Sequence, residues 1–111
     1  MRKLSCNIPI SACVIGCGKA GARFIKAINY LYSTGVPIKL SFVCDSDSRT
    51  LSSCGVSGNV AKYADYTQAF LEHPKVDFIF ICVNDHAHYE IFSHIKTNLV
   101  QYVRILSEKP L

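Results

Sequence analysis

The sequence lacks several features that would place it in a specialised class of protein. No window reaches the roughly 18 consecutive apolar residues that a membrane-spanning helix requires. Ser5, Asn7 and Pro9 interrupt the apolar stretch near the N-terminus, so no signal peptide is expected. Lysine and arginine are scattered singly, with no run longer than Arg2-Lys3, although the formal net charge is +4. A nucleic-acid-binding surface would cluster such residues on one face. We therefore expect a cytoplasmic protein that binds neither membranes nor nucleic acid.

The six cysteines include no Cys-x-x-Cys pair, the spacing typical of zinc sites and redox dithiols. They are Cys6, Cys13, Cys17, Cys44, Cys54 and Cys82. Several lie inside apolar runs, where a free cysteine behaves as a small buried hydrophobic residue. His86 and His88 have no cysteine or carboxylate pair at ligand spacing beside them. The pattern predicts reduced, intracellular thiols and no metal site.

Linkers, internal repeats and low-complexity tracts are also missing, so residues 1–111 are expected to form one domain. What is present is a globular composition, 50% hydrophobic and 18% charged. Short apolar runs alternate with helical patterns, which is typical of a parallel α/β sheet. The predicted strands are 10–15, 38–44, 60–63, 76–83 and 102–106; the predicted helices are 20–32, a short one ending near 53, 67–72 and 87–98. This order predicts a doubly wound parallel sheet of the Rossmann type, with three αβα layers and strand order 3-2-1-4-5.

Two of these helices carry more specific predictions. In the first, Phe24, Ile28 and Leu31 recur on one face, which we expect to pack on the sheet. Asp65 precedes the helix at 67–72 and is predicted to be its N-cap.

The loop after the first predicted strand has the sequence Gly16-Cys17-Gly18-Lys19-Ala20-Gly21. It follows an apolar strand and opens an amphipathic helix, which is the context a dinucleotide-binding glycine loop requires. Gly16 would permit the tight turn, Gly18 the close approach of a pyrophosphate, and Gly21 the packing of helix on sheet. The alternative is a glycine-rich turn without a ligand. Binding would use the unpaired N–H groups of the helix N-terminus.

Asp45 ends the second predicted strand, 24 residues after Gly21. A carboxylate there can accept hydrogen bonds from the adenosine ribose and would repel a 2′-phosphate, so the expected cofactor is NAD, with NADP less favoured. Arg49 would partly offset this preference. Two alternatives stay open: Asp45 as a helix N-cap, and a methyltransferase, which also combines a glycine-rich loop with an acid after the second strand.

Further segments carry a family resemblance. Residues 76–90 form an apolar strand that leads into a loop and then into His88-x-Glu90. This segment resembles the glucose–fructose oxidoreductase and inositol dehydrogenase (Gfo/Idh/MocA) family. The segment Ser107-Glu108-Lys109-Pro110 resembles the same family. Residues 61–66 suit its third-strand region. The resemblance implies a nicotinamide-dependent oxidoreductase that acts on a sugar, cyclitol or related polyol.

The same resemblance implies roles for individual residues. Lys109 would be the catalytic residue, beside the nicotinamide, where a lysine of lowered pKa can act as acid or base. Glu108 is expected to contact the cofactor and to help hold the turn that positions Lys109. Val83, Asn84 and His88 would lie along the nicotinamide side of the cofactor. The alternative for His88 is a helix-start residue satisfied by local backbone.

The sequence departs from the family pattern near the nicotinamide end. Val83-Asn84 replaces the usual Thr-Pro, the segment 88–108 is about three residues longer than usual, and 101–103 lacks the usual glycine. The family's second domain, which supplies the substrate pocket, is not in the sequence. We therefore expect the cofactor domain of a longer enzyme, or a truncated gene product, that binds nucleotide but is inactive alone. The alternative is a non-catalytic NAD-binding module, such as a sensor or truncated paralogue.

Overall fold

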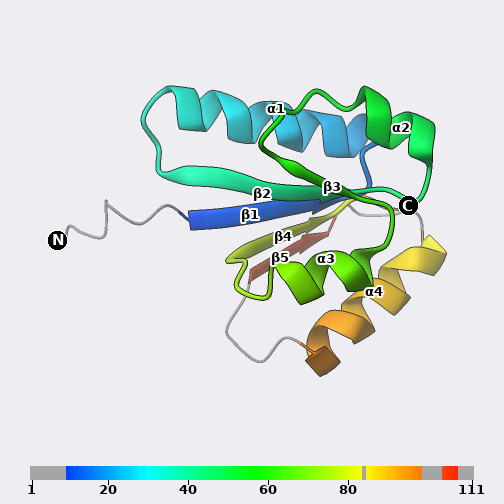
Figure 1. Cartoon of the computed structure of the whole chain (residues 1–111). Helices are drawn as coiled ribbons and strands as arrows, with labels where there is room; N and C mark the ends of the chain where they lie inside the picture. The colour runs from blue at the N-terminus through cyan, green and yellow to red at the C-terminus, as the bar shows by residue number, and fades with distance from the viewer. Residues whose placement is uncertain (1–9, 84, 99–103, 108–111) are drawn as a thin grey trace, which may run out of the picture.

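A computed structural model describes residues 10–83, 85–98 and 104–107 of the chain. Five parallel strands form one sheet in the order β3-β2-β1-β4-β5, as the sequence predicts (Figure 1). The strands are β1 (Ile10–Ile15), β2 (Ile38–Cys44), β3 (Ala61–Tyr63), β4 (Phe78–Ile81) and β5 (Arg104–Ser107). The helices are α1 (Lys19–Ser33), α2 (Ser48–Ser53), α3 (Tyr66–Glu72) and α4 (Asp85–Asn98). The doubly wound Rossmann architecture is therefore confirmed.

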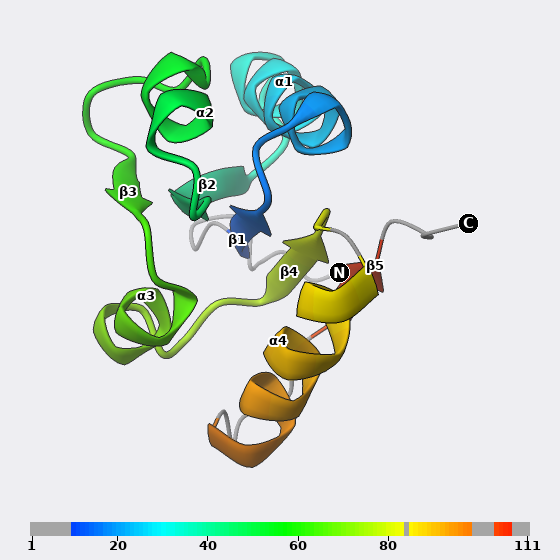
Figure 2. The same ribbon diagram turned by 90° about the vertical axis from the view of Figure 1, so that its right-hand side faces the viewer.

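The helices cover the two faces of the sheet in pairs. Figure 2 shows α1 and α2 on one side of the strands and α3 and α4 on the other. Side chains that alternate along β1 point to opposite faces, so the sheet separates two apolar cores. The core under α1 includes Ala12, Val14, Ile25, Ile28, Leu40, Val43 and Phe80. The core under α3 and α4 includes Cys13, Ile15, Phe42, Phe70, Ile79, Ile91 and Ile95.

Strand β4 is shorter than the sequence pattern predicts. The sequence predicts a strand from residue 76, whereas β4 begins at Phe78. The difference arises at Asp77, whose side chain accepts the backbone hydrogen bond from β1 that a backbone carbonyl would accept in a regular ladder. Its Oδ2 accepts a hydrogen bond from the backbone N–H of Ser11 at 2.9 Å, while its own N–H donates to the Ser11 carbonyl at 3.0 Å. The regular ladder with β1 therefore begins only at Phe78, opposite Ala12.

The buried face of α1 differs in part from the predicted one. Ile28 is buried as expected and Phe24 is half-buried, but Leu31 is 38% exposed and Ile25 is buried instead. The reason is Gly21, which is buried and directs the helix onto the sheet. Residues 21, 25 and 28 then share one face. The sequence analysis identified the buried face from apolar side chains, so it did not count Gly21 as part of that face.

Strand β2 contains a bulge. Ala12 pairs with Leu40, but the next residue of β1, Cys13, pairs with Phe42, so Ser41 is an extra residue. Leu40 and Phe42 would share a face in a regular strand, whereas here they lie in different cores. The bulge thus changes the face on which the second half of β2 presents its side chains.

We predict that Gly21→Ala destabilises the domain. Alanine in a helix is normally about 1 kcal/mol more favourable than glycine. Here the added Cβ would overlap the carbonyl oxygen of Gly16, which is backbone and cannot rotate away. We expect a loss of about 1–3 kcal/mol in the free energy of unfolding, measured by urea denaturation. The control is Gly58→Ala, where the added Cβ meets no atom within 4 Å; equal effects of the two changes would contradict the close contact.

Candidate functional site: the glycine loop

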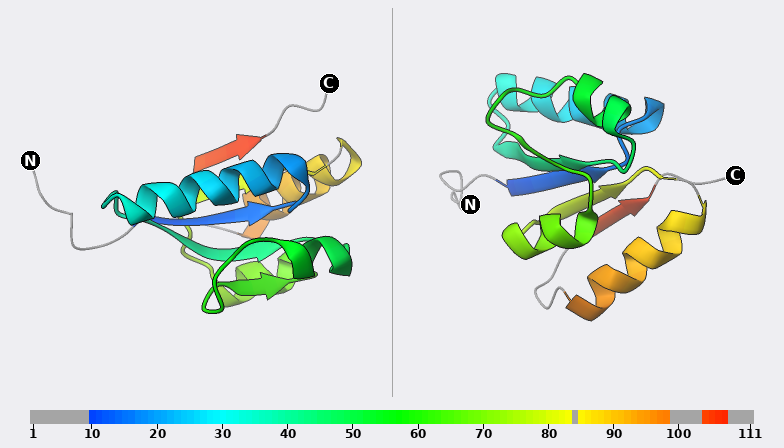
Figure 3. Two further views of the ribbon diagram at one scale, coloured as in Figure 1. Left: turned by 90° about the horizontal axis from the view of Figure 1, so that it is seen from above. Right: turned by 45° about the vertical axis from the view of Figure 1, so that its right-hand side comes forward.

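The glycine loop lies at the carboxyl ends of the strands, where β1 turns into α1 (Figure 3). Gly16 has φ +99°, a backbone conformation that residues with a side chain rarely adopt. A Cβ on Gly16 would also lie 2.5 Å from the Cys82 carbonyl oxygen and 2.9 Å from a methyl group of Val83. Both observations confirm Gly16 as the residue that permits the tight turn beside the end of β4.

Gly21 makes the second close approach in the loop. The Gly16 carbonyl oxygen occupies the place that a Gly21 Cβ would take, and a Val14 methyl group would lie 3.3 Å away. The expected role of Gly21 in packing α1 against the sheet is confirmed. The first turn of α1 is thereby held directly against the end of β1.

Gly18 differs from the other two glycines because the protein gives no steric reason for it. A Cβ at this position would meet no atom within 4 Å. Its φ of −71° is open to any residue, and the residue is exposed. The absence of a side chain at Gly18 therefore keeps a space open in front of α1.

The N-terminus of α1 also has no side-chain cap. Gly18 is its N-cap residue and makes no side-chain hydrogen bond, and no acidic residue lies in the first turn. Asp47 caps α2 and Asp65 caps α3, as predicted for Asp65, by accepting from backbone N–H groups. The first N–H groups of a helix have no partner within it, so α1 presents donors and a positive dipole end at the open space.

Asp45 joins the loop to the end of β2. Its Oδ2 accepts a hydrogen bond from the backbone N–H of Cys17 at 2.7 Å, and its Oδ1 accepts one from that of Asp47 at 2.8 Å. The interpretation of Asp45 as a helix N-cap is wrong, because Asp47 caps α2. The sequence analysis missed the contact between Asp45 and Cys17. The one sequence signal for it is the predicted strand order, which places the first two strands next to each other. The ribose role of Asp45 stays a prediction.

The thiols around the loop are neutral. Burial raises the pKa of Cys17 to about 12, with further contributions from Cys54 and Asp45. Burial and Asp45 raise the pKa of Cys44 to about 12 in the same way. The Cys17 thiol lies 3.6 Å from the Cys44 carbonyl oxygen, beneath the loop. Protonated thiols add no negative charge next to the donors of α1.

The remaining predicted site residues fall in different places. Lys19 is the exposed first residue of α1, and Ala20 follows it half-buried. Val83 is half-buried against the core under α3 and α4, beside Gly16. His88 is half-buried in the first turn of α4. The other predicted site residues, Asn84, Glu108 and Lys109, lie outside the described residues.

None of the helices in the described part is both long and apolar enough to span a membrane. Over residues 10–83, 85–98 and 104–107, no three His, Cys, Asp or Glu side chains come together as metal ligands would.

Several solved structures share this fold. Homoserine dehydrogenase from S. aureus matches with a TM-score of 0.69 and 12% identity, over 92% of this chain and 26% of that chain. Homoserine dehydrogenase from Thiobacillus denitrificans matches with a TM-score of 0.63 and 12% identity, over 89% and 23% of the two chains. RSP, a Rex-family repressor solved in complex with β-NADH, matches with a TM-score of 0.59 and 16% identity, over 93% and 55%. At these identities the likeness concerns the fold alone.

The solved structures are longer than this chain, whereas the family profile matches nearly all of it. The chain spans about a quarter of the homoserine dehydrogenase chains and about half of the repressor chain. No curated protein sequence matches it. The profile of a family described as an oxidoreductase family with an NAD-binding Rossmann fold matches residues 10–111, nearly the whole chain. Together with the glycine loop, this match shows that the chain belongs to the Gfo/Idh/MocA oxidoreductase family, as its NAD-binding Rossmann domain.

Proposed function

We propose that this chain holds NAD at the glycine loop as the cofactor domain of an oxidoreductase that acts on a CH–OH group of a sugar, cyclitol or related polyol. The observation that carries the cofactor site is the open space at Gly18. The fold explains Gly16 and Gly21 by contacts inside the protein, but it gives no internal reason for Gly18. A pyrophosphate against the backbone at Gly18 supplies that reason.

The electrostatics of the loop suit an anion. The uncapped N-terminus of α1 offers backbone N–H donors and the positive end of the helix dipole. Lys19 adds an exposed positive charge at the first position of the helix. The Cys17 thiol is protonated and does not repel a phosphate. These features support phosphate binding on the outer side of the loop.

Asp45 supports a preference for NAD over NADP. Each carboxylate oxygen accepts one backbone N–H, from Cys17 and Asp47, so the carboxylate is held in one orientation beside the loop. A carboxylate oxygen can accept more than one hydrogen bond, so the ribose hydroxyls of NAD could still donate to it. A 2′-phosphate there would meet a fixed negative charge.

The chemistry itself would depend on Lys109. Bound NAD supplies a hydride acceptor, and the chain's task is to position it and to handle the proton of the substrate hydroxyl. By the family resemblance, Lys109 takes that proton, and Glu108 helps to hold the turn that aims it. By the same resemblance, the polyol would bind in a second domain.

A second candidate is a non-catalytic NAD-binding module. The sequence Val83-Asn84 departs from the family pattern at the nicotinamide end. In addition, RSP has a domain of this fold and binds β-NADH in a repressor. This candidate predicts cofactor affinity without turnover, whereas the oxidoreductase predicts both.

We predict that Gly18→Val abolishes NADH binding, because the branched side chain would occupy the space for the pyrophosphate. Since that space is empty of protein atoms, the fold should be retained. NADH fluorescence titration measures the affinity, and circular dichroism verifies the fold. The matched control is Gly58→Val, also at an open position, which should bind NADH normally. Full affinity in the Gly18 variant would refute the proposed cofactor position.

We predict that Asp45→Asn narrows the gap between NADH and NADPH affinity, because it removes the charge that repels a 2′-phosphate. The ratio of the two dissociation constants is the measured quantity, so any general loosening of the loop cancels. Asp47→Asn is the control, since Asp47 caps α2 and should leave the ratio unchanged. An unchanged ratio in the Asp45 variant would make its carboxylate purely structural.

We predict that Lys109→Met lowers polyol oxidation by about 10²- to 10⁴-fold, the usual contribution of a general acid or base. The assay follows NADH formation by the product of the intact gene across a panel of sugars and cyclitols. NADH affinity should stay within a few-fold of the unmodified protein. Binding without turnover for every substrate would instead favour the non-catalytic module.

A further inference from the structure

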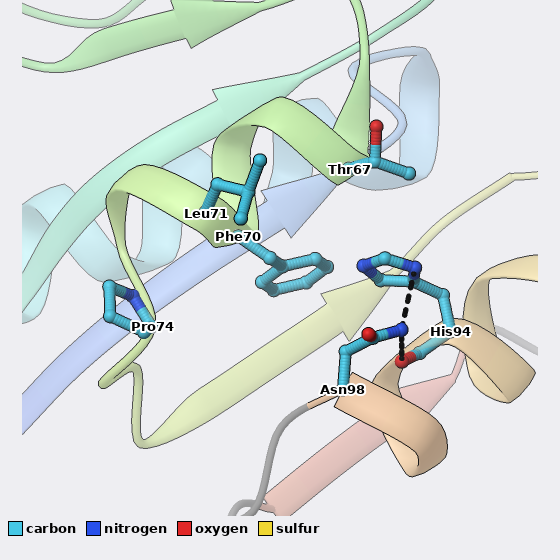
Figure 4. A pocket seen from close by; sticks show the side chains of 6 residues that line it. All are labelled: Thr67, Phe70, Leu71, Pro74, His94 and Asn98. Carbon is cyan, nitrogen blue, oxygen red and sulfur yellow. Dashed lines mark hydrogen bonds between the residues drawn. The ribbon is translucent and has the colours of Figure 1, made fainter.

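A cleft of about 400 Å³ lies between α3 and α4, on the opposite face of the sheet from α1 (Figure 4). It is lined by Thr67, Phe70, Leu71, Pro74, His94 and Asn98. Asn98 Nδ2 donates to the His94 carbonyl oxygen at 3.0 Å. The His94 ring in turn stacks on the Phe70 ring, which is 3% exposed, at a centroid distance of 5.9 Å. These groups are directed at the protein itself, so we assign no ligand to this cleft.

The outer face of α1 carries a row of exposed side chains that are mainly basic. This α1 row consists of Lys19, Arg23 and Lys26, followed by Tyr30, which is 67% exposed. At about 100° per residue, the four positions lie within about 60° of one another and opposite the buried face of the helix. At about 1.5 Å per residue, the row is about 16 Å long. In the left view of Figure 3, α1 lies in front of the strands along its whole length, and no other described element covers it.

The positive charge of the α1 row has no acidic counterpart nearby in the sequence. Helix α1 contains no acidic residue, and all eight acidic residues of the chain lie in 45–111. The first two, Asp45 and Asp47, direct their carboxylates at backbone N–H groups. The basic residues are scattered along the sequence, but the helix brings three of them to one face. Within the described part of the chain, the α1 row is therefore a concentration of positive charge.

We propose that the α1 row is a docking surface for an acidic helix of another protein. Side chains three and four residues apart on a helix have Cβ atoms about 5–6 Å apart. A partner helix with carboxylates at i, i+4 and i+7 therefore matches the spacing of Lys19, Arg23 and Lys26. Arg23 can bind a carboxylate through two parallel N–H groups, and the exposed Tyr30 ring adds apolar contact area. Complementary charge thus determines both the partner and its register.

The number and kind of side chains favour a protein over other anionic partners. Three basic residues are fewer than the roughly 6–10 phosphate contacts of a typical DNA-binding protein, and fewer than the roughly 4–8 Lys or Arg of a lipid-binding cluster. Arginine and tyrosine are among the residues enriched in protein–protein interfaces. A second copy of this chain is disfavoured, because pairing the row with itself would set like charges opposite one another.

The test is an NMR titration of the ¹⁵N-labelled chain with an alanine-rich helical peptide that carries glutamates at i, i+4 and i+7. We expect shifts of the amide signals of α1 at millimolar peptide and low salt, because exposed ion pairs are individually weak. The shifts should fade at about 1 M salt, where the screening length falls to about 3 Å. The matched control peptide has glutamine in place of each glutamate and should not bind.

Arg23→Gln and Lys26→Gln should each weaken peptide binding by about two- to fivefold, the contribution of one exposed ion pair. Both positions are exposed and glutamine is a good helix former, so the fold should be retained. The control variants are Lys75→Gln and Lys96→Gln, which are exposed changes outside α1 that lower the net charge equally. They should leave peptide binding nearly unchanged.

Four results would overturn the proposal. The first is no shift on α1 up to several millimolar peptide. The second is equal binding of the glutamate and glutamine peptides. The third is equal weakening by the α1 variants and the control variants, which would make net charge alone responsible. The fourth is tighter binding of a DNA duplex or of phosphatidylserine vesicles at the same concentration of negative charge. Gly18→Val should leave peptide binding unchanged, so this proposal and the proposed cofactor site can fail independently.

Discussion

The architecture of the site depends on the contact between the Gly16 carbonyl oxygen and the Cα of Gly21. It is a backbone-to-backbone approach that any side chain at Gly21 would prevent. Because of it, α1 begins immediately beside the end of β1 and runs back across the sheet with Ile25 and Ile28 underneath. The same contact determines where the first N–H groups of α1 are presented. Helix packing and anion binding at this loop therefore have one common cause.

A second link extends this rigid corner to the neighbouring strand. Asp45 accepts a hydrogen bond from the backbone of Cys17, so the end of β2 is tied to the loop that follows β1. The contact fixes a carboxylate at the side of the loop, while Gly18 leaves the front of the loop open. An anion-binding face and a fixed negative charge thus stand side by side. This is an arrangement that can distinguish between two dinucleotides that differ in one phosphate group.

The sequence predicted the elements and their order well because their signals are local. The bounds of β1 and β2 follow from apolar runs that end at Gly16 and before Asp45, and Asp65 caps α3 as its position indicates. The errors arise where a tertiary contact outweighs a local pattern. The side chain of Asp77 displaces the start of β4, and Gly21 rotates α1 so that Leu31 is exposed.

The candidate site was also predictable where its signal is local and not where it depends on a tertiary contact. The structural roles of Gly16 and Gly21 follow from the spacing of the glycine motif, and the structure confirms both. The hydrogen bond between Cys17 and Asp45 was missed, since it joins residues 28 positions apart and leaves no periodic signal.

The extra residue in β2 has a consequence for how this domain can change in length. Side chains alternate between the faces, and the bulge at Ser41 reverses that alternation for the second half of the strand. With the reversal, the position after Cys44 belongs to the face of α1, where the Asp45 carboxylate meets Cys17. Without Ser41, Leu40 and Phe42 would be consecutive, and regular alternation would keep Phe42 on the face of α3 and Asp45 on the face of α1. Strand β2 can therefore lose one residue, at the bulge, and still present the Asp45 carboxylate to Cys17, because the bulge absorbs the change in length.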